Sequence, residues 1–220
     1  MVRILLIRSA ATDFDEQGRI KGTLDLPLSD VGTAQAARLI NEVQAVEFDY
    51  LYSSTCRCAV ETANQLGTSR KMKVRQLADF QNVDHGLWHG KLVDELKQTQ
   101  PRIYRQLQEH PETVCPPEGE PLGMAQARAK VAVDRLVRKH RRGTIALVLP
   151  EPFYSLVKQI LAPAAELGDL WKAECQCGGW QLIDLEQEEL QRVVLAPAAA
   201  ISAAVSGGAA VMTGLLFGRY

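Results

Sequence analysis

Two apolar runs constrain the fold of this chain more than any other feature. Val2–Ile7 has the sequence VRILLI, with one early arginine, and Thr144–Leu149 has the sequence TIALVL. Each run has the length of a β-strand and lacks alternation of polar and apolar residues, a pattern typical of a strand buried on both faces. Strands of that kind lie in mainly parallel sheets that helices cover on both sides. We therefore expect such a sheet at the centre of the protein.

The rest of the pattern alternates strands with helices. Shorter strands are expected at Asp49–Ser53, Lys73–Leu77 and Trp180–Asp184. Helices are expected after a cap at Ser29 or Asp30 and over Arg57–Leu66, Val93–Leu107, Met124–His140 and Phe153–Leu161. This alternation predicts βαβ units and an α/β fold with a three-layer α/β/α sandwich around a mainly parallel central sheet. Functional sites in such folds lie beyond the carboxyl ends of the strands, which here are Arg8–Thr12, Ser53–Cys58 and Leu149–Pro152.

Composition narrows the class of protein. The 220 residues suffice for one sizeable domain, alone or with an appendage, and 46% hydrophobic with 23% charged residues is typical of a soluble globular protein. A formal net charge of −1 gives no electrostatic footprint for nucleic acid, and we interpret the basic residues between Arg135 and Arg142 as a solvated helix end. Five unevenly spaced cysteines do not suit a secreted disulfide scaffold, and the short apolar start lacks a signal-peptide cleavage site. We expect a cytoplasmic protein.

The loop after the first strand carries a recognisable motif. The segment Ile7–Ala36 resembles the opening of the histidine phosphatase superfamily, in which R-H-G-E-T is followed by an Asn and by G-R-x-x-G-x-x-D-x-P-L-S-x-x-G-x-x-Q-A. The residues that match in register are Arg8, Thr12, Gly18, Arg19, Gly22, Asp25, Pro27, Leu28, Ser29, Gly32, Gln35 and Ala36.

Later blocks extend the resemblance over most of Val2–Asp184. They are Ser53–Ala63, Asn82–Gly90, Pro117–Glu120 and Ile145–Leu161. The resemblance implies a phosphoglycerate-mutase-like fold for this chain. It ends near Asp184, so we expect a domain over residues 1–190 and an Ala- and Gly-rich apolar tail over residues 191–220.

The departures from the family pattern fall on its chemistry. In the family a histidine accepts the phosphoryl group, two arginines and a second histidine surround the phosphate, and an acidic residue protonates the leaving group. Here the first arginine remains as Arg8, the nucleophile position is Ser9, and the second arginine is Cys58. The position of the acid is Asn82, and that of the second histidine is Pro150.

Each replacement removes a specific capability. A serine without an adjacent base is a poor nucleophile at neutral pH, and an asparagine such as Asn82 cannot donate a proton as an acid does. Pro150 can neither donate a hydrogen bond nor carry charge. No catalytic residue is therefore intact by this pattern. We predict a pseudophosphatase with a binding or regulatory role, and the alternative is a phosphohydrolase or phosphomutase of the same family with a displaced or altered site.

Two charged positions and two histidines leave alternatives open. Arg8 could keep a residual anion contact, or it could pair with Asp13, Asp15 or Glu151. Asp15 replaces the phosphate-contacting Asn of the family pattern, so we expect its negative charge to offset that of Arg8. His85 and His89 are the candidates for a relocated nucleophile, against the simpler interpretation of hydrogen-bonded or exposed loop histidines.

The cysteines include two C-x-C pairs, Cys56 with Cys58 and Cys175 with Cys177, while Cys115 stands apart. Structural zinc sites more often use C-x₂₋₄-C spacing, so we expect neither a metal nor another cofactor. Cys58 lies near the start of an expected helix, which could lower the pKa of its thiol and make it reactive.

The segment Val193–Gly218 contains no charged residue. Its length would permit a membrane-spanning helix, but Ala and Gly dominate, and Pro197 and the Gly207–Gly208 pair interrupt it. We favour a tail packed on the domain or on a partner subunit over membrane association. The partner, whether a protein or a small molecule, and the oligomeric state are left open by the sequence.

Overall fold

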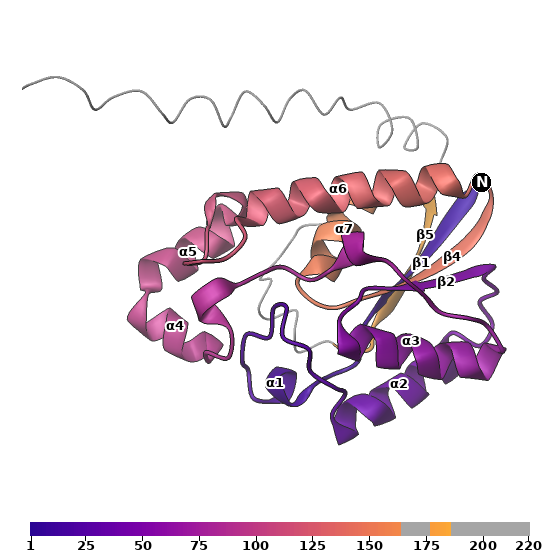
Figure 1. The fold of residues 1–220 in the computed structure, drawn as a ribbon, viewed down its shortest axis with the longest axis horizontal. Helices are drawn as coiled ribbons and strands as arrows, with labels where there is room; N and C mark the ends of the chain where they lie inside the picture. The colour runs from indigo at the N-terminus through magenta and orange to yellow at the C-terminus, as the bar shows by residue number, and fades with distance from the viewer. Residues whose placement is uncertain (164–176, 186–220) are drawn as a thin grey trace, which may run out of the picture.

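The structure is a computed structural model that describes residues 1–163 and 177–185. Its sheet contains β1 (Val2–Arg8), β2 (Tyr50–Ser53), β3 (Arg75–Gln76), β4 (Gly143–Leu149) and β5 (Trp180–Leu185) in the order β3-β2-β4-β1-β5. β4 pairs in parallel with both β1 and β2, whereas β5 is an antiparallel edge strand beside β1. The prediction that the first, second and fourth strands are parallel neighbours is confirmed (Figure 1).

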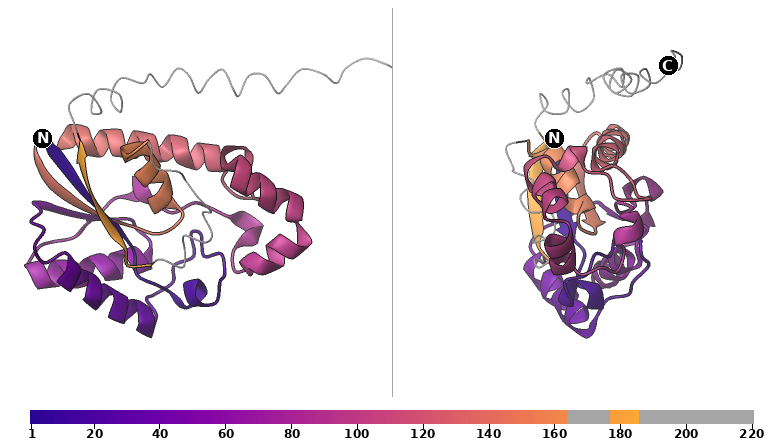
Figure 2. Two further views of the ribbon diagram at one scale, coloured as in Figure 1. Left: turned by 180° about the vertical axis from the view of Figure 1, so that it is seen from behind. Right: turned by 90° about the vertical axis from the view of Figure 1, so that its left-hand side faces the viewer.

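Helices cover both faces of this sheet. α2 (Asp30–Glu42) and α3 (Arg57–Arg70) lie on one face, and α6 (Leu122–Lys139) and α7 (Phe153–Leu161) lie on the other (Figures 1 and 2). Alternate residues of β1 serve the two layers, because Ile4 and Leu6 pack with α6 and α7, whereas Leu5 and Ile7 pack with α2 and α3. All four side chains are fully buried, so the absence of polar alternation in this strand follows from burial on both faces. The predicted α/β sandwich is confirmed.

Smaller helices and turns connect these layers, and the helix predicted over Val93–Leu107 differs from what the structure shows. They are α1 (Asp13–Glu16), α4 (Val93–Thr99), α5 (Pro101–Glu109) and short 3₁₀ turns at Ala78–Phe80, Gly86–Trp88 and Pro111–Thr113. The single helix expected over Val93–Leu107 is two helices, because Gln100 leaves the helical conformation before Pro101. Pro101 has no N–H to donate to the preceding turn and instead starts α5. The third strand is also shorter than the expected Lys73–Leu77.

Hydrogen bonds of the N-cap residue of α2 hold the loop that follows β1 in place. Ser29 is the N-cap, and its side chain accepts a hydrogen bond from the Gly32 N–H at 3.0 Å. The Ser29 N–H donates to the Ala11 carbonyl at 3.0 Å. A Cβ atom on Gly32 would lie only 1.9 Å from that carbonyl oxygen, so this close approach requires glycine. The loop Ser9–Thr12 is thereby held against the start of α2.

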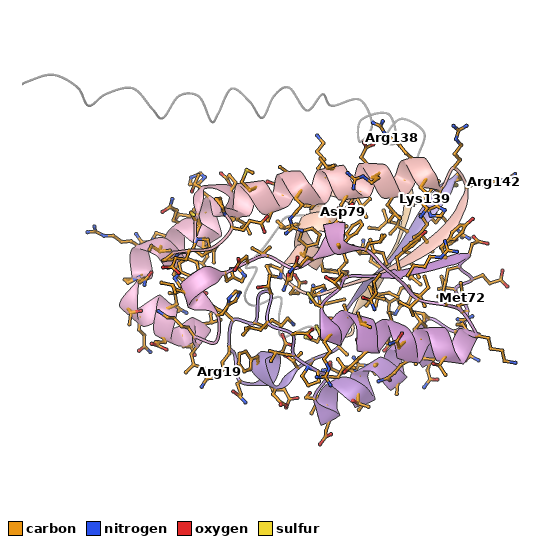
Figure 3. All side chains as sticks on the ribbon, viewed as in Figure 1. Arg19, Met72, Asp79, Arg138, Lys139 and Arg142 are labelled. Carbon is orange, nitrogen blue, oxygen red and sulfur yellow. The ribbon has the colours of Figure 1, made fainter. Side chains whose placement is uncertain are left out.

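The basic run at the end of α6 is solvated except for one residue. Arg138 and Arg142 are exposed and project from the end of the helix (Figure 3). His140 departs from the expected solvated helix end, since it is buried and its Nε2 lies 2.9 Å from the hydroxyl of Tyr52. Burial is the main cause of its lowered pKa, with Lys139 and Arg75 adding to the effect. His140 therefore belongs to the core beneath the helix end.

The tail Val193–Gly218, on which the membrane and packing hypotheses rest, lies outside the described residues. Within the described part of the chain, no helix combines the length and apolar character needed to cross a bilayer.

Candidate functional site

The carboxyl ends of the strands bring the four replaced family positions together. The Ser9 N–H donates to the Leu149 carbonyl at 2.8 Å, which sets Ser9 beside the start of the Pro150 loop. The N–H of the next residue, Ala10, donates to the Thr62 hydroxyl at 3.1 Å, and that hydroxyl donates to the Cys58 carbonyl at 2.7 Å, which links the Ser9 loop to the first turn of α3. Asn82 Nδ2 donates to the carbonyl of Glu151 at 2.7 Å. The predicted convergence of these four positions, all of them buried, is therefore observed.

Asn82 is used as an amide rather than as a weakened acid. Its Nδ2 donates to the carbonyls of Gly22 at 2.8 Å and Glu151 at 2.7 Å, and its Oδ1 accepts the Phe153 N–H at 3.3 Å. An ionised carboxylate has no proton to donate to either carbonyl. The side chain thus ties the first loop to the start of α7 and requires an amide for that purpose.

Arg8 is paired with the carboxylate of Glu151. The Arg8 Nε lies 2.6 Å from Glu151 Oε1, and the two side chains are 9% and 0% exposed. The guanidinium also stacks on Tyr154, 4.6 Å from the ring centre. Burial raises the pKa of Glu151, while Arg8 and the hydrogen bonds of Ser155 oppose that rise. Of the three partners that the sequence allowed for Arg8, the structure selects Glu151.

Asp15 does not offset Arg8 as the sequence led us to expect, because it has a partner of its own. Its Oδ1 lies 2.6 Å from Lys21 Nζ, and each side chain of this pair is only 2% exposed. Its Oδ2 accepts the N–H of Thr12 at 2.7 Å and the Thr12 hydroxyl at 2.8 Å, within the capping box of α1. Lys21 was missed because it occupies a variable position of the motif, and a lone loop lysine gives no sequence signal of burial.

Among the residues that the structure describes, the four buried Asp, Glu, Lys and Arg side chains carry charges that sum to zero. Arg8 and Lys21 are balanced by Glu151 and Asp15. Arg57, one residue from the vacated position of the second family arginine, adds nothing here because its side chain is 53% exposed and pairs with Glu61 at 2.8 Å. The surroundings of Ser9 therefore carry no net positive charge from these groups with which to attract a dianion.

Cys58 is a buried thiol with a raised pKa. Desolvation is the largest cause of the shift, and the nearby Lys21 only partly counters it. The shift is opposite to the lowering that a helix N-terminus would give, so the reactive-thiol hypothesis is not supported. Cys177 is also buried, and the N–H of the following Gly178 donates to the Ser9 carbonyl at 3.2 Å.

Metal binding receives no support from the described cysteines. Cys175, the other member of the second C-x-C pair, lies outside the described residues, while Cys115 is exposed. Across residues 1–163 and 177–185, no three Cys, His, Asp or Glu side chains are grouped so that they could hold a metal ion.

The two loop histidines have different environments. Burial lowers the pKa of His85 to about 4, with a smaller contribution from His89, so His85 is neutral at pH 7. His89 Nε2 accepts the N–H groups of Thr23 at 3.3 Å and His85 at 3.2 Å. Because that nitrogen already accepts two hydrogen bonds, its lone pair is not available for attack on phosphorus. His89 instead joins its own loop to the segment at Gly22 and Thr23.

A family comparison accounts for this arrangement of strand ends. Residues 4–196 match the family profile of the histidine phosphatase superfamily (branch 1). The chain belongs to the histidine phosphatase superfamily. Its resemblance to that family, stated above from the motifs, is therefore confirmed.

Relatives of this histidine phosphatase homologue carry phosphatase names. It is 28% identical over 188 residues to phosphoserine phosphatase 1 of Hydrogenobacter thermophilus, which covers 85% of this chain and 88% of that protein. It is 24% identical to the adenosylcobalamin/alpha-ribazole phosphatase of Escherichia coli, with 85% and 92% covered. The solved structure of Bacillus stearothermophilus YhfR aligns with a TM-score of 0.74 at 26% identity, covering 85% of this chain and 93% of that one.

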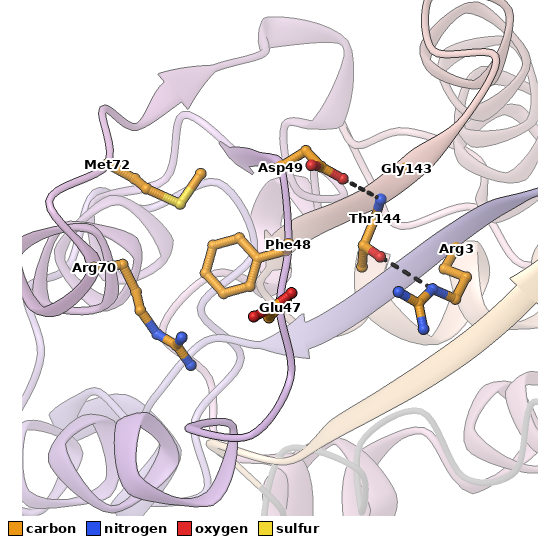
Figure 4. Close-up of a pocket in the computed structure, with 8 residues that line it drawn as sticks. All are labelled: Arg3, Glu47, Phe48, Asp49, Arg70, Met72, Gly143 and Thr144. Atoms are coloured by element: carbon orange, nitrogen blue, oxygen red, sulfur yellow. Dashed lines mark hydrogen bonds between the residues drawn. The ribbon is translucent and has the colours of Figure 1, made fainter.

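A separate hollow lies at the opposite end of the sheet. It has a volume of about 460 Å³ and is lined by residues that include Arg3, Asp49, Arg70 and Thr144 (Figure 4). Arg3 and Thr144 lie at the amino ends of β1 and β4, away from Ser9. Thr144 joins the walls, since its N–H donates to Asp49 at 2.8 Å and its hydroxyl accepts from Arg3 at 3.1 Å. This hollow is therefore distinct from the family site.

Proposed function

We propose that this chain is a catalytically inactive histidine-phosphatase-fold protein, a pseudophosphatase with a binding or regulatory role. The observation that carries the proposal is the buried ion pair between Arg8 and Glu151. The arginine that matches a phosphate-contacting position of the family is bonded to a carboxylate of the protein itself. Ser9 and Pro150 stand where the family pattern has its two histidines.

The surroundings of Ser9 support this proposal. Activation of a serine needs a neighbouring base, and the Cys58 thiol beside it is held in its protonated form by burial. Asn82 has both of its polar atoms engaged by backbone groups and has no acidic proton. Loss of one member of a concerted catalytic set lowers kcat by roughly 10⁴ to 10⁶-fold, so several losses leave no efficient route.

The alternative function is a phosphohydrolase or phosphomutase of the same family that uses an altered site. The observation that favours it is the buried His85, which is neutral at pH 7 and whose ring lies 6.3 Å from that of His89. A neutral imidazole is the form that could accept a phosphoryl group. The phosphatase names of the relatives make phosphate monoesters the substrates to test.

The test is an assay of the full chain with phosphoserine and with p-nitrophenyl phosphate. We expect release of phosphate at the rate of the buffer blank, with the Ser9→Ala and His85→Gln variants giving the same result. Turnover above the blank that Arg8→Ala or His85→Gln removes would contradict the proposal and establish the alternative. The cytoplasmic location and the division into residues 1–190 and 191–220 stay predictions from the sequence.

A further inference from the structure

Glu151 has the hydrogen-bonding environment of a bound anion. Its carboxylate lies 2.6 Å from the Arg8 Nε, and it accepts the Ser155 hydroxyl at 3.1 Å and the Ser155 N–H at 3.3 Å. The side chain is fully buried. A guanidinium, a hydroxyl and a backbone N–H in the first turn of a helix are the donors that proteins commonly offer to sulfate or phosphate. A protein carboxylate receives them here.

Glu151 lies next to positions that match the catalytic residues of the family pattern. Glu151 directly follows Pro150, which stands at the position of the second family histidine, and its partner Arg8 precedes the nucleophile position. We infer that Glu151 is a built-in counter-anion of Arg8, and that removing its carboxylate allows an inorganic dianion such as sulfate to bind there. This inference rests on the proposed function, because an arginine bonded to a carboxylate of the protein itself is not available to a phosphate ester.

The charges around Arg8 support the direction of this effect. With Glu151 ionised, the two buried pairs sum to zero, and an incoming dianion is repelled by the Glu151 and Asp15 carboxylates. Without the Glu151 charge, the charges of Arg8, Lys21 and Asp15 sum to +1. Removing one member of a buried ion pair is unfavourable, so an anion from solution that takes the place of the Glu151 carboxylate beside Arg8 is stabilised.

The experiment is sulfate binding by full-length Glu151→Gln, measured by titration calorimetry at constant ionic strength. Glutamine preserves the size of the side chain and removes its charge. We expect sulfate to bind at least about 100-fold more tightly than to the wild type, a difference of about 2.8 kcal/mol at 1.4 kcal/mol per tenfold change. The gain should disappear in the double variant Glu151→Gln/Arg8→Met.

Asp134→Asn is the matched control. It also removes one carboxylate from an arginine pair, Asp134 with Arg138 at 2.9 Å, but this pair lies on the exposed side of α6 and its arginine is 56% exposed. Sulfate binding by this variant should equal that of the wild type. Equal gains in Asp134→Asn and Glu151→Gln would show a nonspecific effect of net charge and would overturn the inference.

A measurement on the wild type decides the question if Glu151→Gln does not fold. Burial raises the pKa of Glu151 against the opposing effects of Arg8, Ser155 and Lys21. Within the described part of the chain, Asp15, Cys58 and Tyr154 are further titratable groups around Arg8, Lys21 and Glu151. Because sulfate stays a dianion, its binding should strengthen as the pH falls from 7 towards 5, in an Arg8-dependent way.

The two proposals fail in different ways. Sulfate binding that is weak in a folded Glu151→Gln, or pH-independent in the wild type when the variant does not fold, overturns the inference and leaves the pseudophosphatase proposal standing. Hydrolysis of a phosphate ester by the wild type overturns the proposed function whatever sulfate does.

Discussion

The strand interiors and the strand ends of this protein are equally buried but are stabilised in different ways. Ile4 and Leu6 in β1 are fully buried apolar side chains, and each gains about 1.5–3 kcal/mol from leaving water without needing a specific partner. Two residues further on, Arg8 is also buried, yet it depends on one carboxylate 2.6 Å away. The comparison teaches that apolar burial stabilises the sheet without specific partners, whereas a buried charged side chain at the strand ends needs a partner of its own.

The largest expected effect comes from breaking a buried ion pair on one side only. Asp15→Ala leaves Lys21 buried without its carboxylate, and the free energy of unfolding should fall by about 3–5 kcal/mol. Urea denaturation followed by circular dichroism measures this change. The double variant Asp15→Ala/Lys21→Met should recover much of the loss. If the double variant is as unstable as the single one, the cost lies in the lost capping box of α1 and not in the unpaired charge.

The second prediction concerns the buried His85 and the pH dependence of the free energy of unfolding. The pKa of His85 is about 4 in the folded protein, against 6.5 for an ordinary histidine, so the folded state resists protonation. The free energy of unfolding keeps its full value above pH 6.5 and falls as the pH drops towards about 4, by about 3 kcal/mol in total. The measurement is the stability of the wild type minus that of His85→Gln across this range. A difference that does not vary with pH would show that His85 is protonated to the same extent in both states.

A smaller loss is expected when the family's acid is restored. Asn82→Asp leaves the carbonyls of Gly22 and Glu151 without the amide donor, and stability should fall by about 1–3 kcal/mol at pH 7. Hydrolysis of phosphoserine should stay at the blank level, because the nucleophile is still missing. Thermal denaturation and the phosphatase assay on the same sample check both statements. An active Asn82→Asp variant would show that the rest of the site is competent.

The smallest effect should come from the exposed pair on α3. Arg57→Ala removes the side-chain partner of Glu61, but both groups lie near solvent, and exposed pairs contribute about 0.2–1 kcal/mol or less. We expect a shift in the denaturation midpoint near the error of the measurement. A loss of stability comparable with that of Asp15→Ala would mean that Arg57 stabilises the buried charged groups near Arg8. It would contradict the description of the Arg57–Glu61 pair as an exposed ion pair.

The sequence by itself determined the sheet and the meeting of the replaced positions. Apolar runs such as Val2–Ile7 have the length and uniform character that burial on both faces demands. The spacing of the family motifs was enough to predict that Ser9, Cys58, Asn82 and Pro150 share one end of the sheet, because parallel strands end at the same edge. The break before Pro101 was missed by the prediction of one helix over Val93–Leu107, although the residue before a proline disfavours helical geometry.

Only the tertiary structure decided which charges pair. Arg8 had three candidate carboxylates in the sequence, and Glu151, the one most distant along the chain, is its partner. Lys21 and the acceptor role of His89 carried no local pattern at all. The physical reason is that hydrogen bonds and ion pairs form over about 3–4 Å, and at the strand ends that distance is set by how β1 and β4 lie side by side. Hydrophobic burial is non-directional and leaves a periodic signal in the sequence, whereas a single directional contact between distant loops leaves none.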